Sequence, residues 1–295
     1  MSAIIYALTA NAGIAASKAA AAVYTGSSAM LAEAVHSGAD CANQLLLLLG
    51  IKQAQWAPTP QHPLGYGKAT YFWSFMVALL LFSMGGAFSI YEGVHKLSSP
   101  EPVESPWIAI AVLGIGVVLE AWSLRGCILE IREKAGDMPL WRYFRDSRES
   151  ELIVVMGEDI AALAGLALAL LAVVLSMVTG NPMWDAIGSI AVGVLLVIVA
   201  IGVGIEVRAL LIGQSAEPAE RTAMEEWLKT RPEIAELYNM ISFQMGTYLF
   251  VAVKARMAER DSAKVLIDQV NAVQDALKVE FPDVRWVFFE PDDKG

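Results

Sequence analysis

The chain has 295 residues, of which 56 % are hydrophobic and 18 % are charged, and its formal net charge is −10. An ordinary soluble chain has about 45–50 % apolar and about 25 % charged residues, so this composition excludes a single soluble globule. It also excludes a disordered chain, and two cysteines are too few for a disulfide scaffold. The negative charge, without a cluster of Lys and Arg, argues against nucleic acid as a partner.

Six apolar stretches are each long enough to cross a hydrocarbon layer, which takes about 20 helical residues. An isolated span satisfies its backbone groups in lipid only as a helix, so we predict an all-α bundle of six membrane helices. A secretory signal peptide is not expected at the start, because the first stretch lacks a basic leading region and a second span follows at once. The six stretches cover residues 4–23, 29–51, 71–94, 107–127, 152–178 and 185–205.

The loops predict the orientation of the bundle. Nine Lys and Arg residues lie in the loops after the second, fourth and sixth spans, whereas the opposite loops contain only Lys96. Because cytoplasmic loops carry the excess of positive charge, we expect both chain termini on the cytoplasmic side.

A change of pattern beyond Gly213 marks a second domain. Residues 215–295 hold 25 charged residues, against 27 in the much longer segment that precedes them. Apolar residues recur at helical spacing over 217–231 and 261–280, and strand patterns cover 237–244, 247–257 and 285–290. The order helix, strand, strand, helix, strand predicts a small α+β domain with helices on one face of its sheet. We therefore expect a membrane domain over 1–212 and a cytoplasmic domain over 213–295, and we expect the uncovered sheet to favour a homodimer.

Five ionisable residues lie inside the predicted spans, where each costs about 2.5–3.5 kcal/mol on insertion scales. The second span holds Glu33, His36 and Asp40, and the fifth holds Glu158 and Asp159. His36 and Asp40 are four residues apart, so both side chains point from one helix face, and Glu33 extends that face. An imidazole with carboxylates suits a divalent metal such as zinc. A structural polar network, in which His36 fixes helix packing by bonding a carboxylate, is the alternative.

Other charged residues in or near the spans have simpler explanations. Lys18 in the first span pairs with a carboxylate or reaches for the interface. Glu120 and Asp185 could steer cations, although Asp185 lies close enough to a span end to face water.

Two stretches, 24–40 and 62–68, read YTGSSAMLAEAVHSGAD and HPLGYGK, and they resemble the cation diffusion facilitator family of metal transporters. GEDIAA over 157–162 and TGNP over 179–182 resemble the branch of that family typified by the ninth vertebrate zinc transporter. The resemblance implies six spans, a metal site shared by the second and fifth spans, and a cytoplasmic ferredoxin-like domain. It also implies export of divalent metal, zinc above all, in exchange for protons by a homodimer in a cell inner membrane. The metal is then cargo, and no resident cofactor is expected.

The candidate ligands are His36, Asp40 and Asp159, followed by Glu158 and Glu33, which either bind the metal or orient the residues that do. Aligned on Asp159, the family's other fifth-span ligand falls on Val155, so one expected ligand is missing. Glu158 is the nearest replacement, but it lies about 100° round the helix from Asp159. Glu33, Asn43 or Asn11 could complete the site instead.

Lys68 matches a family lysine that pairs with an acidic residue at the end of span six. Gly213 stands near that place here, so we do not expect this ion pair.

Three alternatives to a zinc exporter remain open. An oxygen-rich site that includes Glu33 and Glu158 would admit manganese, cobalt or iron. A membrane metalloenzyme would need an additional base, and the chain has neither an HExxH nor a GxSxG motif. The third alternative is a non-transporting protein that is anchored by its spans and binds partners through its soluble domain. This would explain why Val155 stands in place of a metal ligand.

Overall fold

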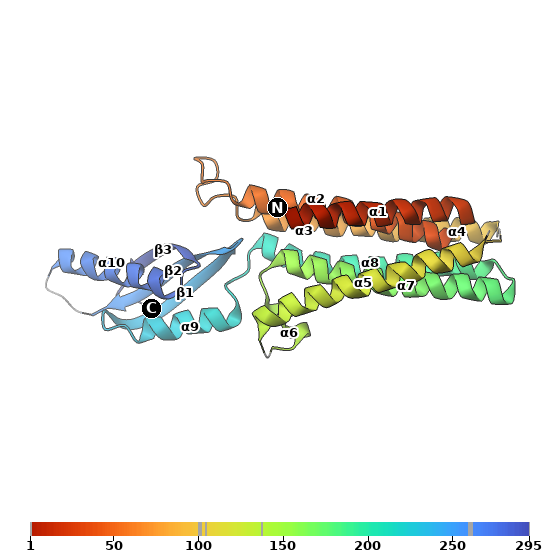
Figure 1. Cartoon of the computed structure of the whole chain (residues 1–295). Helices are drawn as coiled ribbons and strands as arrows, with labels where there is room; N and C mark the ends of the chain where they lie inside the picture. The colour runs from red at the N-terminus through yellow and green to blue at the C-terminus, as the bar shows by residue number, and fades with distance from the viewer. Residues whose placement is uncertain (1, 100–101, 104, 137, 259–261, 295) are drawn as a thin grey trace.

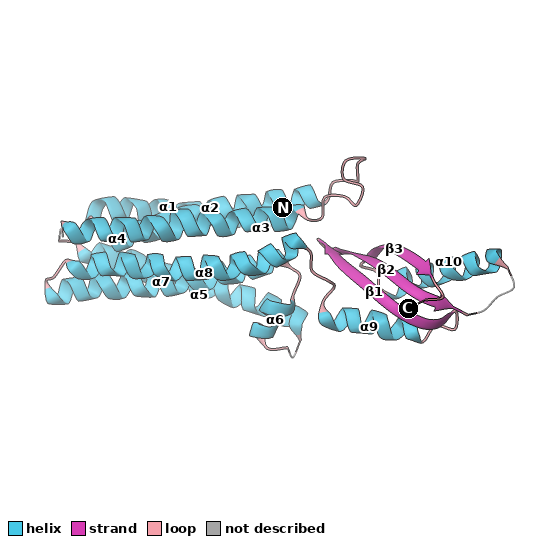
Figure 2. Cartoon of the chain, turned by 180° about the vertical axis from the view of Figure 1, so that it is seen from behind, coloured by secondary structure: helices cyan, strands magenta, loops and turns pink. Residues whose placement is uncertain are grey.

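The computed structural model describes residues 2–99, 102–103, 105–136, 138–258 and 262–294. Long helices lie side by side in an elongated bundle, and a small α+β unit extends from one end of it (Figures 1 and 2). All six predicted stretches are helical. The bundle contains α1 (Ser2–Thr25), α2 (Ser28–Ala54), α3 (Ala69–Leu80), the π-helix η1 (Leu81–Ala87), α4 (Phe88–Ser98), α5 (Pro106–Ala135), the short α6 (Leu140–Asp146), α7 (Ser150–Thr179) and α8 (Met183–Ile212).

Four helical segments are long and apolar enough to cross a membrane, within the residues that the structure describes. They are Ala69–Ser98, Pro106–Glu133, Leu152–Thr179 and Met183–Ile212. The first of them is the continuous run of α3, η1 and α4. The helices α1 and α2 are not in this group. The chain is thus a membrane protein built on a helical bundle.

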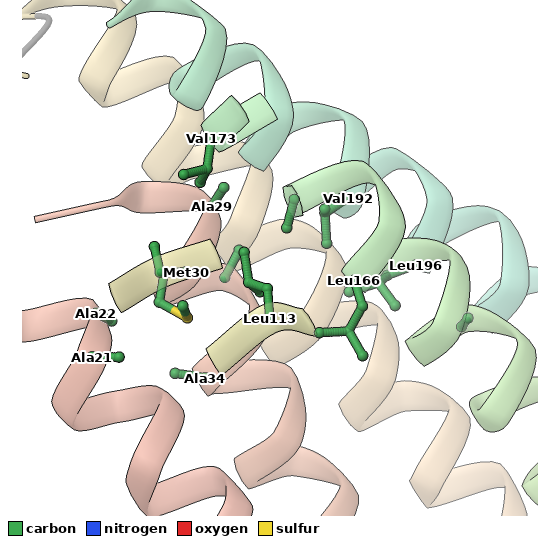
Figure 3. Close-up of a cluster of buried hydrophobic side chains, with 14 of the residues drawn as sticks. Ala21, Ala22, Ala29, Met30, Ala34, Leu113, Leu166, Val173, Val192 and Leu196 are labelled. Carbon is green, nitrogen blue, oxygen red and sulfur yellow. The ribbon is translucent and has the colours of Figure 1, made fainter. Parts of the chain in front are cut away.

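Small side chains dominate the core of the bundle. Figure 3 shows Met30, Leu113 and Leu166 among alanines such as Ala21 and Ala34, all of them buried. Alanine at these positions lets helices approach closely, as small residues do in membrane bundles.

A buried carboxylate joins three helices at the end of the bundle away from the α+β unit. Asp185 in the first turn of α8 is fully buried, and its two oxygens accept hydrogen bonds from Ser27 Oγ at 2.5 Å and from Ser28 N at 2.7 Å. Lys96 Nζ lies 3.3 Å from the same carboxylate. Ser27 also caps α2, because its Oγ accepts from Met30 N at 3.1 Å. The expectation that Asp185 could face water was therefore wrong: a neighbouring helix N-terminus and a lysine stabilise its charge.

Glycines let α8 lie against η1 and α4. A Cβ atom on Gly193 would lie 2.7 Å from Ile90 Cγ1 and 2.8 Å from Gly86 O. Two backbones in this direct contact hold α3–α4 and α8 together as one unit.

Substitution of Gly193 by alanine tests this contact. We expect Gly193→Ala to destabilise the protein by about 1–3 kcal/mol, because the new methyl group meets backbone atoms that cannot yield cheaply. Gly202→Ala in the same helix is the matched control, since its Cβ would meet nothing within 4 Å. Thermal unfolding in detergent measures the difference, and equal melting temperatures for the two variants would contradict the tight contact.

The C-terminal unit has the predicted order of elements. α9 (Pro218–Lys229) precedes β1 (Ile234–Met245) and β2 (Tyr248–Met257), and α10 (Ala263–Glu280) precedes β3 (Val284–Pro291). The sheet order is β1-β2-β3, with β1 and β2 antiparallel and β2 and β3 parallel. Its core is formed by buried apolar side chains of both helices and of alternate positions along β2: Met224, Leu228, Val273, Leu277, Leu249, Val251 and Val253.

The other face of the sheet is open and apolar. Ile241 is 56 % exposed and Phe288 is 59 % exposed, and Phe250 stacks on Phe288 with ring centroids 5.3 Å apart. In register, Ile241 faces Ala252 across the β1–β2 pair, and Phe288 faces Ala252 across the β2–β3 pair. The predicted division into a helix-covered face and an uncovered face is confirmed.

The β1–β2 turn contacts the start of α3. Gly246, with φ +72°, occupies the turn. Its N–H donates to Tyr71 Oη at 3.1 Å, and that hydroxyl donates to Gly246 O at 3.1 Å. Beside it, Lys68 Nζ lies 4.3 Å from the centre of the Phe243 ring and donates to Leu211 O at 3.3 Å. Partial burial lowers the pKa of Lys68. The lysine thus bonds a carbonyl and an aromatic ring rather than a carboxylate, as the glycine at position 213 led us to expect.

Candidate metal centre

A cavity of about 130 Å³ opens between α1, α2, α5 and α7. Four carboxylic acids contribute to its wall: Asp40 from α2, Glu120 from α5, and Glu158 and Asp159 from α7. The rest of the wall mixes polar and apolar side chains, namely Ile14, Ser37, Gln44, Leu119, Ser123, Val155 and Ala162. So many acidic groups around one space inside a membrane bundle favour a cation as its occupant.

The α2 side of the site is close to the predicted arrangement. His36 Nδ1 lies 3.7 Å from Asp40 Oδ1, as expected for side chains one helical turn apart. His36 is fully buried, and it is not among the side chains that form the cavity wall. Both of its ring nitrogens and Asp40 Oδ1 lack a hydrogen-bond partner among the described residues. Buried polar atoms normally have one, so this pair is available to a ligand.

Two acidic neighbours on α7 both face the cavity because helices on opposite sides hold them. Asn43 Nδ2 of α2 donates to Glu158 Oε1 at 2.6 Å. Ser123 Oγ of α5 lies 3.4 Å from each oxygen of Asp159. The angle of about 100° between adjacent residues therefore spreads the two carboxylates toward α2 and α5, and the helix between Ser150 and Thr179 is continuous. Val155 also lies on the wall, where it presents an apolar side chain.

Glu33 has a partner of its own. Lys18 Nζ lies 3.4 Å from Glu33 Oε2 and donates to Ser37 Oγ at 2.7 Å, and the lysine is 1 % exposed. The predicted pairing of Lys18 with a carboxylate is confirmed. Glu33 does not line the cavity, and neither does His36, so the wall carries only three of the five candidate ligands. Glu33 lies where α7 comes close, because a Cβ on Gly165 would be 2.8 Å from Glu33 Oε1.

The candidate ligands do not converge on one point. Among the described residues, no three of the His, Cys, Asp and Glu side chains stand close enough together to hold an ion. Binding would thus require side chains to move inward. Sequence reasoning did not identify Ser37, Gln44 and Ser123, since uncharged polar residues are common in membrane helices and their spacing alone gives no signal.

Known proteins share this sequence pattern over most of its length. The cation efflux transmembrane domain matches residues 4–212. The chain belongs to the cation efflux family. Relatives of this family member include the "Proton-coupled zinc antiporter SLC30A9, mitochondrial" of Xenopus laevis, 37 % identical over 226 residues that cover 76 % of this chain and 40 % of the relative. The Homo sapiens protein of the same name is 34 % identical with the same coverage.

A plant relative gives the same assignment. "Metal tolerance protein C4" of Arabidopsis thaliana is 35 % identical over 219 residues, which cover 74 % of this chain and 48 % of the relative. The chain thus spans about 40–48 % of the length of these relatives. Within the cation efflux family it lies close to the SLC30A9 branch.

The Lys18–Glu33 pair allows a stability test. We expect Lys18→Met to lower the free energy of unfolding by about 3–5 kcal/mol, since it leaves a buried carboxylate without its cation. Adding Glu33→Gln should restore most of the loss, because the remaining amide carries no charge. Thermal unfolding of the two single variants and the double variant measures the coupling. Lys52→Met, at an exposed position of the same helix as Glu33, is the control, and a Lys18→Met protein as stable as this control would disprove the pairing.

Proposed function

We propose that this protein exports divalent metal cations, with zinc as its cargo, from the cytoplasm in exchange for protons. The observation that carries the proposal is the cavity between α1, α2, α5 and α7, whose wall includes Asp40, Glu158 and Asp159. Membership of the cation efflux family supports it, as do the zinc antiporters among the relatives. Because the family and these relatives are named as transporters, they favour transport over the alternative of a membrane metalloenzyme.

In this proposal residues 1–212 form the transport domain and residues 213–295 a cytoplasmic ferredoxin-like domain. Six spans follow if α1 and α2 join the four apolar segments, with both termini in the cytoplasm of a cell whose inner membrane holds the protein. The span of the family match, 4–212, supports the boundary. The mixed sheet with two helices on one face supports the fold of the second domain.

The cargo would be held by Asp40, Asp159 and His36, with Glu158 as a further ligand and Glu33 as an orienting neighbour. The positive ion offsets the repulsion among carboxylates and draws them inward, while the unpartnered ring nitrogens of His36 offer the imidazole that zinc prefers. Ligands must lose their protons to bind metal, so protonation on the far side would release the ion.

Alternating access would occur between two groups of helices. The cavity wall comes entirely from α1, α2, α5 and α7, whereas backbone contact at Gly193 joins α8 to α3–α4. Rocking of the first group against the second would open the cavity to either side of the membrane.

A homodimer fits the uncovered sheet face. Ile241, Phe250 and Phe288 lie on it, and a second copy would remove these apolar side chains from water.

Manganese, cobalt or iron is the alternative cargo, because the cavity wall itself presents oxygen ligands. A non-transporting interaction protein is the remaining alternative. The apolar Val155, which stands in place of a metal ligand, favours this alternative over a membrane metalloenzyme.

Uptake by proteoliposomes tests the transport proposal. With an imposed pH gradient, we expect zinc flux through the parent protein and a fall of at least about tenfold in Asp40→Asn, Asp159→Asn and His36→Ala, since each removes a ligand. Asp268→Asn, an exposed residue of α10, is the matched control for the aspartate variants. Zinc, manganese, cobalt and cadmium are compared in the same vesicles. Parental flux in the three site variants would contradict the assignment, and binding without flux would support the interaction protein.

The oligomeric state tests the sheet face. We expect Ile241→Lys to convert a dimer into a monomer, or to weaken it by an order of magnitude, because a charge would be buried in the contact. Ile267→Lys is the control, since Ile267 is equally exposed on α10, at 58 % against 56 %. Light scattering after gel filtration measures the mass, and a dimer unaffected by Ile241→Lys would exclude this face as the interface.

A further inference from the structure

Glu120 is a carboxylic acid in the middle of a membrane-crossing helix. It lies 14 residues from the first and 13 from the last residue of the apolar segment Pro106–Glu133. At about 1.5 Å per residue, this places it about 20 Å from either end. It is the one acidic residue of the sequence between Pro106 and Ile128. A carboxylate at such a depth costs about 2.5–3.5 kcal/mol, so a compensating interaction is required.

Most of α5 faces outward, but Glu120 does not. Val118 and Trp122 on either side of it are 68 % and 79 % exposed, as lipid-facing residues would be. Glu120 instead lines the cavity together with Ser123, three residues further on the same helix face. Ser123 in turn lies 3.4 Å from both oxygens of Asp159. The polar face of α5 is thus turned toward the acidic pair of α7.

No direct partner among the described residues provides this compensating interaction, and the charge of Lys18 acts on Glu120 only from beyond salt-bridge distance. Within the described ranges, Glu120 makes no hydrogen bond and no ion pair, whereas Glu33 has Lys18 and Asp185 has Lys96. Two further oxygens near it, Gln44 Oε1 and Asp40 Oδ1, are buried without a hydrogen-bond partner among the described residues. Gln44 and Asp40 line the same cavity. The wall therefore carries oxygen atoms without a direct partner on α2 and α5, beside the hydrogen-bonded carboxylates of α7.

We propose that Glu120 contacts the transported metal ion and sets which metals the site accepts. This rests on the proposed function and extends it to a third helix, α5. Glu120 adds a carboxylate oxygen to those of Asp40, Glu158 and Asp159. An oxygen-rich site accommodates manganese, which takes about six oxygen ligands, whereas zinc is satisfied by four ligands that include an imidazole. Loss of the Glu120 carboxylate should therefore weaken the binding of manganese more than the binding of zinc.

Binding and uptake of Zn²⁺ and Mn²⁺ by the full-length protein test the proposal. In Glu120→Gln we expect the affinity for Mn²⁺ to fall by at least about tenfold and the affinity for Zn²⁺ to fall less, so that the ratio of the two affinities shifts toward zinc. Glu120→Asp keeps the carboxylate and should retain some of the Mn²⁺ affinity. Glu130→Gln is the matched control, because it makes the same change at an exposed position of the same helix.

The melting temperature of each variant is measured alongside, and a merely structural role would change it without changing the affinity ratio. A Glu120→Gln protein with the same Zn²⁺ and Mn²⁺ affinities as Glu130→Gln would overturn the proposal. An equal loss of affinity for Zn²⁺ and Mn²⁺ in Glu120→Gln would overturn the role of Glu120 in selectivity. A parent protein that binds and transports neither ion would instead contradict the proposed function itself.

Discussion

A charged group that enters the hydrocarbon layer must find a hydrogen bond, an opposite charge or a proton, and the helical bundle is arranged around this requirement. Asp185 accepts hydrogen bonds from two serines and pairs with Lys96, and Glu33 pairs with Lys18. These pairs hold helices together. The carboxylates on the cavity wall meet this requirement only incompletely, through single contacts from Asn43 and Ser123. The bundle therefore contains paired charges that join helices and, on the cavity wall, carboxylates that have no lysine or arginine partner among the described residues.

The closeness of helix packing also differs from place to place in the bundle. Where α8 meets η1 and α4, glycines bring backbone against backbone, and little movement is possible without breaking that contact. Where α1, α2, α5 and α7 meet, side chains leave a cavity. The β1–β2 turn contacts α3 through Tyr71, so the C-terminal unit is attached to the tightly packed group. The acidic cavity thus lies among helices other than α3, to which the soluble domain is attached.

Hydropathy and residue spacing predicted much of this molecule, because helices in lipid and alternating strands leave strong periodic signals. They predicted all six helical stretches, the order of elements beyond residue 213 and the proximity of His36 to Asp40. They did not predict the environment of Asp185, since its partners are 158 and 89 residues away in sequence. Nor did they show that Glu158 leans toward α2 and Asp159 toward α5. Such contacts depend on the rotation and depth of whole helices, and no periodicity within one helix encodes them.

Because of the π-helix at Leu81–Ala87, the packing of α4 depends on where along α3, η1 and α4 a residue is lost. A π-turn bonds residue i to i+5 and so holds one residue more than an α-turn. Deletion of a single residue there would let a regular α-helix form and would leave α4 in nearly the same phase, whereas a deletion in the α-helical part of α4 before Gly93 would turn that glycine by about 100° relative to α3. Gly93, whose missing Cβ leaves room for Ala186 O, would then turn away from α8. A one-residue deletion in the exposed loop around Pro58 would be absorbed without such a change. In this helix, the number of residues specifies the packing as much as their types do.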